Sequence, residues 1–221
     1  MVKGNLASKP QVIIFDCDGV LFDSRRANQM FYNHLLSHFG KASLTEEALD
    51  YVHMHTAGES VDYLFKDEPT RNLVYRYHQT LDYTPFLQQM EMEPGLIEFL
   101  AFIRPQIKTA ICTNRTTTIR PVLRIFSLDS YFDLVVSALD VRQPKPHPES
   151  VYKILSFFEV NPENCLYIGD SEVDARTAES AGVPLVAYKN PALPADLHVR
   201  GFSELKTYLE NGHRERKTHG C

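Results

Sequence analysis

A short apolar run that leads directly into two acids restricts the possible folds of this chain more than any other feature. Residues 12–15 read Val-Ile-Ile-Phe, and Asp16, Cys17, Asp18 and Gly19 follow them. Such a run is typical of a parallel strand buried on both faces, and open α/β sheets bind ligands at the carboxyl ends of such strands. The motif predicts a nucleophile or metal ligand at Asp16 and an acid/base at Asp18. Taken alone, it is equally compatible with a strand followed by an Asp-Gly turn.

Three later segments place polar residues in the same kind of position. Residues 108–114 form a second short apolar run that ends in small hydrogen-bonding side chains, and residues 166–174 form a third that ends in Gly-Asp with another Asp four residues later. Between them, two prolines enclose a single lysine ahead of a helix start. The residues concerned are Thr113, Asn114, Lys145, Asp170 and Asp174. This ordered set favours a catalytic site over a series of unrelated turns.

Strand and helix patterns alternate through most of the chain, which predicts an α/β fold with a parallel sheet covered by helices on both faces. The expected strands are 12–16, 108–113, 134–137, 166–169 and 185–188. The expected helices are 96–102, 117–126, 148–158, 173–181 and 202–209.

Residues 23–92 interrupt this alternation and show no convincing strand. Their periodicity predicts helices over 26–39, from Thr45 onward, over 59–65 and over 70–81, with a break at 53–58. The expected organisation is therefore a core formed by residues 1–22 and 93–212, with a small helical insert at 23–92. Residues 213–221 have no apolar stripe and are expected to be disordered.

Composition excludes several classes of partner. The 221 residues are 43% hydrophobic and 23% charged with a net charge of -5, which leaves no basic footprint for nucleic acid. No apolar run is long enough to cross a bilayer, and no signal peptide is visible. The four cysteines, Cys17, Cys112, Cys165 and Cys221, have no metal-binding spacing. Buried free thiols are expected, which indicates a reducing, cytoplasmic location.

The ordered motifs resemble those of the haloacid dehalogenase-like hydrolase superfamily. The resemblance extends from about residue 11 to about residue 209 and is to the phosphoglycolate phosphatase-like and beta-phosphoglucomutase-like branch with a helical cap. It implies a Rossmann-like parallel sheet with strand order 3-2-1-4-5, and a cap at 23–92 above the carboxyl ends of the strands.

The resemblance also implies roles for the polar residues. Asp16 matches the nucleophile and Asp18 the acid/base, while Thr113 and Asn114 match the phosphate-binding position. Lys145 matches a lysine that binds phosphate and restrains the nucleophile.

A Mg²⁺ ion is implied as well. Its ligands would be Asp16, the backbone carbonyl of Asp18, and Asp170, with Asp174 acting through water or hydrogen bonds. The alternative for Asp170 is a helix N-cap, and the alternative for Asp174 is an acid favoured by the helix dipole in the first turn.

The expected function is a Mg²⁺-dependent phosphatase of small phosphomonoesters, of the phosphoglycolate or sugar phosphate type, which acts through an aspartyl-phosphate. A sugar-phosphate mutase on the same scaffold is the alternative, and a non-catalytic binding protein is a weaker one. The partner would be a small phosphorylated metabolite, with no nucleic acid and no membrane, and the chain a monomer or homodimer. Arg25, Arg26, His53 and His55 are candidate cap residues for specificity, although a plain helix connector explains the last two equally well.

Overall fold

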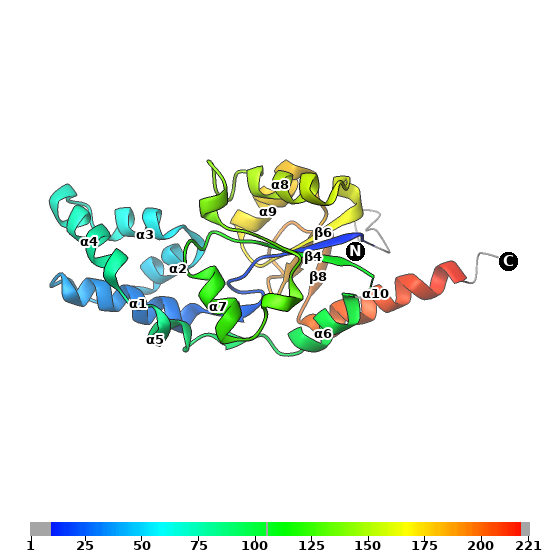
Figure 1. The fold of residues 1–221 in the computed structure, drawn as a ribbon, viewed down its shortest axis with the longest axis horizontal. Helices are drawn as coiled ribbons and strands as arrows, with labels where there is room; N and C mark the ends of the chain where they lie inside the picture. The colour runs from blue at the N-terminus through cyan, green and yellow to red at the C-terminus, as the bar shows by residue number, and fades with distance from the viewer. Residues whose placement is uncertain (1–9, 105, 218–221) are drawn as a thin grey trace.

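A six-stranded parallel sheet forms the centre of the molecule (Figure 1). The computed structural model describes residues 10–104 and 106–217. Within these residues the order of the strands in the sheet is β5-β4-β1-β6-β7-β8. The strands are β1 (Val12–Phe15), β4 (Lys108–Cys112), β5 (Leu134–Val136), β6 (Cys165–Gly169), β7 (Leu185–Tyr188) and β8 (Leu197–Val199). The first five of these strands in the chain have the predicted order 3-2-1-4-5, and β8, which is short and was not expected, extends the sheet at one edge.

The two faces of the sheet are built from alternate residues of the same strands. Val12 and Ile14 belong to one buried cluster, together with residues of α8 (Glu149–Phe158) and α9 (Glu172–Ala181). Ile13 and Phe15 belong to the other cluster. The helices on that second face are α6 (Leu96–Ile103), α7 (Ile119–Ile125) and α10 (Phe202–Lys217). Because β1 is apolar on both faces and lies at the centre, its carboxyl end is a fixed platform for the residues that follow it.

A group of helices between β1 and β4 in the sequence has its own apolar core and lies at one end of the molecule (Figure 1). Its helices are α1 (Arg25–His38), α2 (Glu46–Met54), α3 (Ala57–Leu64), α4 (Glu68–Thr80) and α5 (Thr84–Leu87). The side chains of Thr45, Thr56 and Asp67 accept backbone N–H bonds at the starts of α2, α3 and α4, as N-cap residues do. We call α1–α5 the cap.

The structure differs from the sequence prediction at several points. Two-residue strands β2 (Phe22–Asp23) and β3 (Glu91–Met92) pair antiparallel where the chain enters and leaves the cap, although no strand was expected there. Each is too short to show a periodicity. Helix α5 and three 3₁₀ helices were also not expected. These 3₁₀ helices are η1 (Asp129–Tyr131), η2 (Ala138–Asp140) and η3 (Pro162–Asn164).

The end of the chain is also more regular than predicted. Helix α10 continues to Lys217, beyond the expected end at residue 209, and the disorder expected over 213–221 stays a prediction. Residues 218–221, including Cys221, and residues 1–9 lie outside the described part of the chain. Cys17, Cys112 and Cys165 are free and buried, as expected. None of the described helices is both long and apolar enough to cross a membrane.

Candidate active site

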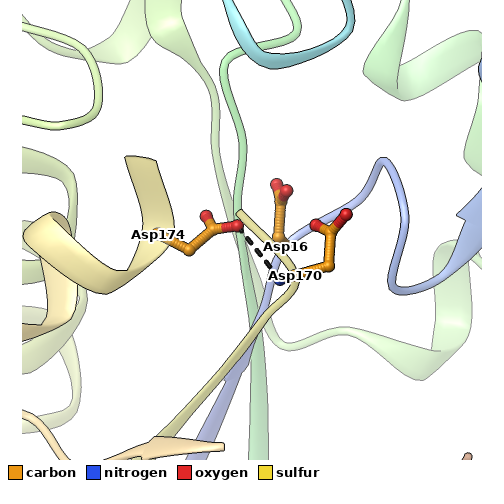
Figure 2. Close-up of side chains that lie close together, drawn as sticks. All are labelled: Asp16, Asp170 and Asp174. Carbon is orange, nitrogen blue, oxygen red and sulfur yellow. Dashed lines mark hydrogen bonds between the residues drawn. The ribbon is translucent and has the colours of Figure 1, made fainter. Parts of the chain in front are cut away.

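The polar residues of the motifs come together at the carboxyl end of the sheet. Asp16 follows β1, Thr113 follows β4 and Asp170 follows β6, and β1 pairs with both β4 and β6. In parallel neighbours these ends lie at one edge, so three strands deliver three functional side chains to the same place. Figure 2 shows the carboxylates of Asp16 and Asp170 side by side, with Asp174 approaching from α9.

Lys145 links two of the acids. Its Nζ lies 2.8 Å from Oδ1 of Asp16 and 2.7 Å from Oδ1 of Asp174, and it donates to the Tyr167 hydroxyl at 3.3 Å. Burial opposes a charge on this lysine, but the two carboxylates outweigh burial and hold the pKa of Lys145 well above its ordinary value. Lys145 is therefore a permanent cation that fixes one oxygen of Asp16.

Asn114 holds the Lys145 loop in place with both ends of its amide. Its Oδ1 accepts from the backbone N–H of Lys145 at 3.0 Å, and its Nδ2 donates to the carbonyl of Lys145 at 3.1 Å. The side chain thus positions Lys145; Asn114 also lines the cavity, and its role in phosphate binding stays a prediction. Thr113 is buried, and its hydroxyl oxygen accepts from the Arg115 N–H at 3.1 Å, which leaves the hydroxyl proton available to a ligand in the cavity.

Both oxygens of Asp174 are already bound. Oδ1 accepts from Lys145 and, at 2.9 Å, from Tyr167. Oδ2 accepts from the Ser171 hydroxyl at 2.7 Å and from the N–H groups of Ser171 and Asp170. Ser171, and not Asp170, is the N-cap of α9, with Asp174 as the acid of its capping box. These contacts favour the hydrogen-bonding role of Asp174 over direct metal ligation.

Asp16 and Asp170 are the best-placed metal ligands. One oxygen of each, together with one of Asp174, lies in a group whose members are all within 4.8 Å of one another. No described residue donates a hydrogen bond to the Asp170 carboxylate or forms an ion pair with it. Burial, and then the charge of Asp174, raise the pKa of both Asp16 and Asp170. Asp16 is buried with Lys145 as its positive partner, and the neighbouring, half-buried Asp170 has none; a hard cation such as Mg²⁺ would supply the missing positive charge.

Two glycines allow this close approach. Gly19 has φ +82°, and a Cβ there would lie 2.1 Å from Oδ2 of Asp170. A Cβ on Gly169 would lie 2.4 Å from the Cβ of Asp174. Any side chain at either position would displace an acid, so the Asp-Gly and Gly-Asp pairs are geometric requirements of the site.

Asp18 forms an ion pair that the sequence analysis did not anticipate. Arg115 donates from Nε to Oδ2 at 2.8 Å and from Nη2 to Oδ1 at 2.6 Å, and the Ser24 hydroxyl donates to Oδ1. Burial opposes ionisation of Asp18, but the Arg115 guanidinium outweighs it and lowers the pKa of Asp18 below its ordinary value. Asp18 is thus held as a carboxylate. The sequence signal that could have identified Arg115 as a site residue was its position directly after Thr113 and Asn114 at a strand end.

A cavity of about 100 Å³ lies between these residues and the cap. Asp16, Asp18, Arg115, Lys145 and Asp170 line its sheet side, and residues of α1, α2, α4 and α5 line its cap side. His53 and His55 are among the cap residues that line it. Arg25 and Arg26 line a different depression, and Arg25 is paired with Glu46 and Asp50 there, so neither arginine reaches the cavity. Tyr167, whose hydroxyl contacts Lys145 and Asp174, lies inside an apolar run, so the sequence did not indicate that it belongs to the site.

The fold and the site are those of a hydrolase whose active-site aspartates lie at the carboxyl edge of a Rossmann-like sheet. Residues 13–188 match the family described as haloacid dehalogenase-like hydrolase. The chain belongs to this family.

Relatives of known name cover most of the chain. It is 32% identical to a phosphoglycolate phosphatase of Rhodobacter capsulatus, over 90% of this chain and 96% of that one. It is 30% identical to a putative pyrophosphatase PpaX of Caldanaerobacter subterraneus, over 86% of each.

Two solved structures match as well. A subfamily IA hydrolase of this superfamily from Geobacter sulfurreducens has a TM-score of 0.79 at 39% identity, over 89% of this chain and 97% of that one. A beta-phosphoglucomutase from Clostridium difficile shares the fold, with a TM-score of 0.80 at 21% identity, over 95% and 99%.

We expect Mg²⁺ to stabilise the fold more at pH 8 than at pH 6. Because the pKa values of Asp16 and Asp170 are raised, the metal-free native state keeps protons that the unfolded chain loses above the ordinary value of 3.8. The free energy of unfolding of the metal-free protein therefore decreases as pH rises from about 4 toward the raised values. A cation needs ionised carboxylates, so its affinity increases over the same range. Thermal unfolding with and without Mg²⁺ at the two pH values measures this difference.

The control for this experiment compares two aspartates. Asp170→Asn should remove most of the Mg²⁺-dependent shift, whereas Asp129→Asn, on exposed η1, should retain it. An equal Mg²⁺ shift at pH 6 and pH 8 in the wild type would contradict the assignment of these acids.

Proposed function

We propose that this hydrolase is a Mg²⁺-dependent phosphatase that acts on small phosphomonoesters through an aspartyl-phosphate, an acyl phosphate formed on Asp16. The arrangement of Asp16 carries the proposal. One of its carboxylate oxygens is held by Lys145 at 2.8 Å, and no described residue donates to the other, which lies on the cavity beside Asp170. A carboxylate fixed by one oxygen presents the second for nucleophilic attack.

The transfer requires two steps on one phosphorus atom. In the first, the free oxygen of Asp16 forms a bond to phosphorus while the bond to the substrate alcohol breaks. In the second, a water oxygen bonds to phosphorus, the Asp16–phosphorus bond breaks, and inorganic phosphate leaves. Lys145, the Thr113 hydroxyl and the backbone amides at the strand ends would stabilise the charge on the phosphoryl oxygens.

Asp18 would move the protons. In the first step it gives a proton to the departing alkoxide, and in the second it takes one from the attacking water. With both oxygens bound to Arg115, Asp18 has the ionised form that the second step needs. To act as the acid in the first step, it must be protonated and must release at least part of the Arg115 contact.

The residues present fit a magnesium site. Asp16, Asp170 and the backbone carbonyl of Asp18 would hold the ion, which would supply positive charge between the nucleophile and the substrate phosphate. Asp174 would keep Lys145 and the start of α9 in position around it.

Release of inorganic phosphate tests the function and separates it from a mutase. The purified chain should release phosphate from simple esters with Mg²⁺ over many turnovers, without a bisphosphate activator, and a chelator should stop the release. Ca²⁺ should support little turnover, because its larger and more flexible coordination can take both oxygens of a carboxylate and so occupy the attacking one. Negligible phosphate release together with conversion of a hexose 1-phosphate to its 6-phosphate would show a mutase instead. Full activity in a chelator would rule out the metal.

A further inference from the structure

The cap side of the cavity has an apolar wall. Six side chains from α1, the end of α2, and the segment that contains α5 contribute to it: Phe31, Val52, Met54, Tyr83, Phe86 and Leu87. The rings pack on one another, with centroids 5.4 Å apart for Phe31 and Tyr83 and 5.5 Å apart for Phe31 and Phe86. The part of a substrate that faces the cap therefore meets mainly ring and aliphatic surface.

No lysine or arginine of the cap lines this cavity. Four cap cations have partners elsewhere: Arg25 pairs with Glu46 and Asp50, Arg71 pairs with Asp62, and Lys41 and Lys66 lie over the rings of Phe65 and Tyr63. The basic cap side chains along the lining are three histidines, His53, His55 and His78. Burial lowers the pKa of His78, which contacts the Tyr83 hydroxyl through its ring.

The two cations on the sheet side are already paired. Lys145 has Asp16 and Asp174, and Arg115 has Asp18. A second anionic group on a substrate would have to compete with Asp18 for Arg115 or rely on the imidazoles of the cap wall. Both are less favourable than an unpaired lysine or arginine would be in a site of this burial.

Neutral polar contacts are available instead. Asn28 and His53 both line the cavity, and the Asn28 amide Nδ2 lies 3.0 Å from Nδ1 of His53, so Nε2 of His53 has no hydrogen-bond partner among the described residues. This pair can bond a hydroxyl or ether oxygen of an uncharged leaving group.

The geometry points to a substrate class: phosphate monoesters of small, uncharged alcohols that carry an apolar ring, in preference to substrates with a second anionic group such as 2-phosphoglycolate or pyrophosphate. This inference depends on the proposed phosphatase function. It places the phosphoryl group at Asp16 and the ring of the leaving group against Phe31, Tyr83 and Phe86.

The direct test compares benzyl phosphate with 2-phosphoglycolate at pH 8, where an ordinary imidazole is neutral. Both leaving groups are primary alkoxides, so a difference in kcat/KM reports the fit of the remainder of the molecule. We expect kcat/KM for benzyl phosphate to be at least about tenfold higher, the usual effect of a matched apolar pocket. Pyrophosphate, measured in parallel, should be hydrolysed less efficiently than benzyl phosphate.

A charge placed on the wall should weaken the preference. Met54 lines the cavity and is 37% exposed, so Met54→Lys adds a cation without burying it fully. We expect the ratio of kcat/KM for 2-phosphoglycolate to that for benzyl phosphate to rise by about tenfold, as a charged hydrogen bond provides. Leu73→Lys adds the same charge to the cap at a residue that is 53% exposed and outside the cavity lining, and it should leave the ratio unchanged.

The outcomes separate this inference from the function on which it depends. If 2-phosphoglycolate or pyrophosphate is hydrolysed as efficiently as benzyl phosphate, the substrate class is wrong and the phosphatase assignment stands. The same holds if Met54→Lys and Leu73→Lys change the ratio equally, since the leaving group would then not contact the wall. If the folded protein with Mg²⁺ releases phosphate from no ester, including p-nitrophenyl phosphate, both are wrong.

Discussion

The Asp16→Asn variant should release no phosphate above background from any ester that the wild type hydrolyses. An amide cannot form the aspartyl-phosphate, and the substitution also removes a carboxylate from the acidic group with Asp170. Loss of a group that acts as part of a catalytic unit costs roughly 10⁴–10⁶ in rate. Steady-state release of inorganic phosphate with Mg²⁺ measures the effect.

The fold of this variant should remain intact. Because burial already favours the uncharged form of Asp16, a neutral amide of the same shape replaces it with little strain, and it relieves the repulsion from Asp174. Thermal unfolding should therefore give a midpoint close to that of the wild type in the absence of metal. Asp129→Asn, at an exposed residue, should retain full activity. A folded Asp16→Asn protein with near-normal turnover would rule out Asp16 as the nucleophile.

The second large effect is expected at Asp18. Asp18→Ala should lose roughly 10²–10⁴ in rate, the usual contribution of general acid–base catalysis. The loss should be larger for alkyl esters than for p-nitrophenyl phosphate, because an alkoxide needs a proton to depart and p-nitrophenolate does not. Comparing kcat for the two substrates in wild type and variant measures the difference.

A second variant separates proton transfer from structure. Removing the Asp18 carboxylate leaves the Arg115 guanidinium, whose side chain is only 10% exposed, without its partner. Asp18→Asn keeps an oxygen that Arg115 and Ser24 can bond but cannot transfer a proton. It should lose activity to a similar extent and remain well folded. Equal losses for alkyl and aryl esters in both variants would argue against an acid role.

Local sequence patterns were sufficient to predict the sheet and the acids that follow its strands. The short apolar run of β1 indicates a strand buried on both faces, whereas its central place in the sheet was implied only by the family resemblance. The positions of Asp16, Thr113 and Asp170 follow in turn, because residues after parallel strands share one edge. Strands β2, β3 and β8 could not be predicted, since two or three residues carry no periodicity and pair only because the surrounding chain places them side by side.

The pairings within the site were decided by the tertiary structure. Arg115 and Asp18 are 97 residues apart in the chain, and Lys145 meets Asp174 at a separation of 29. A single sequence shows that these charges exist but not which one each will neutralise, because the choice depends on how loops close over the sheet edge. The sequence by itself determined an α/β chain with acids at the carboxyl ends of its strands. Only the tertiary structure decided that Asn114 and Asp174 position Lys145 and that Arg115 holds Asp18. It also decided that the cap lines the cavity with rings and not with lysine or arginine, because the packing of the cap helices on their own core sets which of their faces meets the cavity.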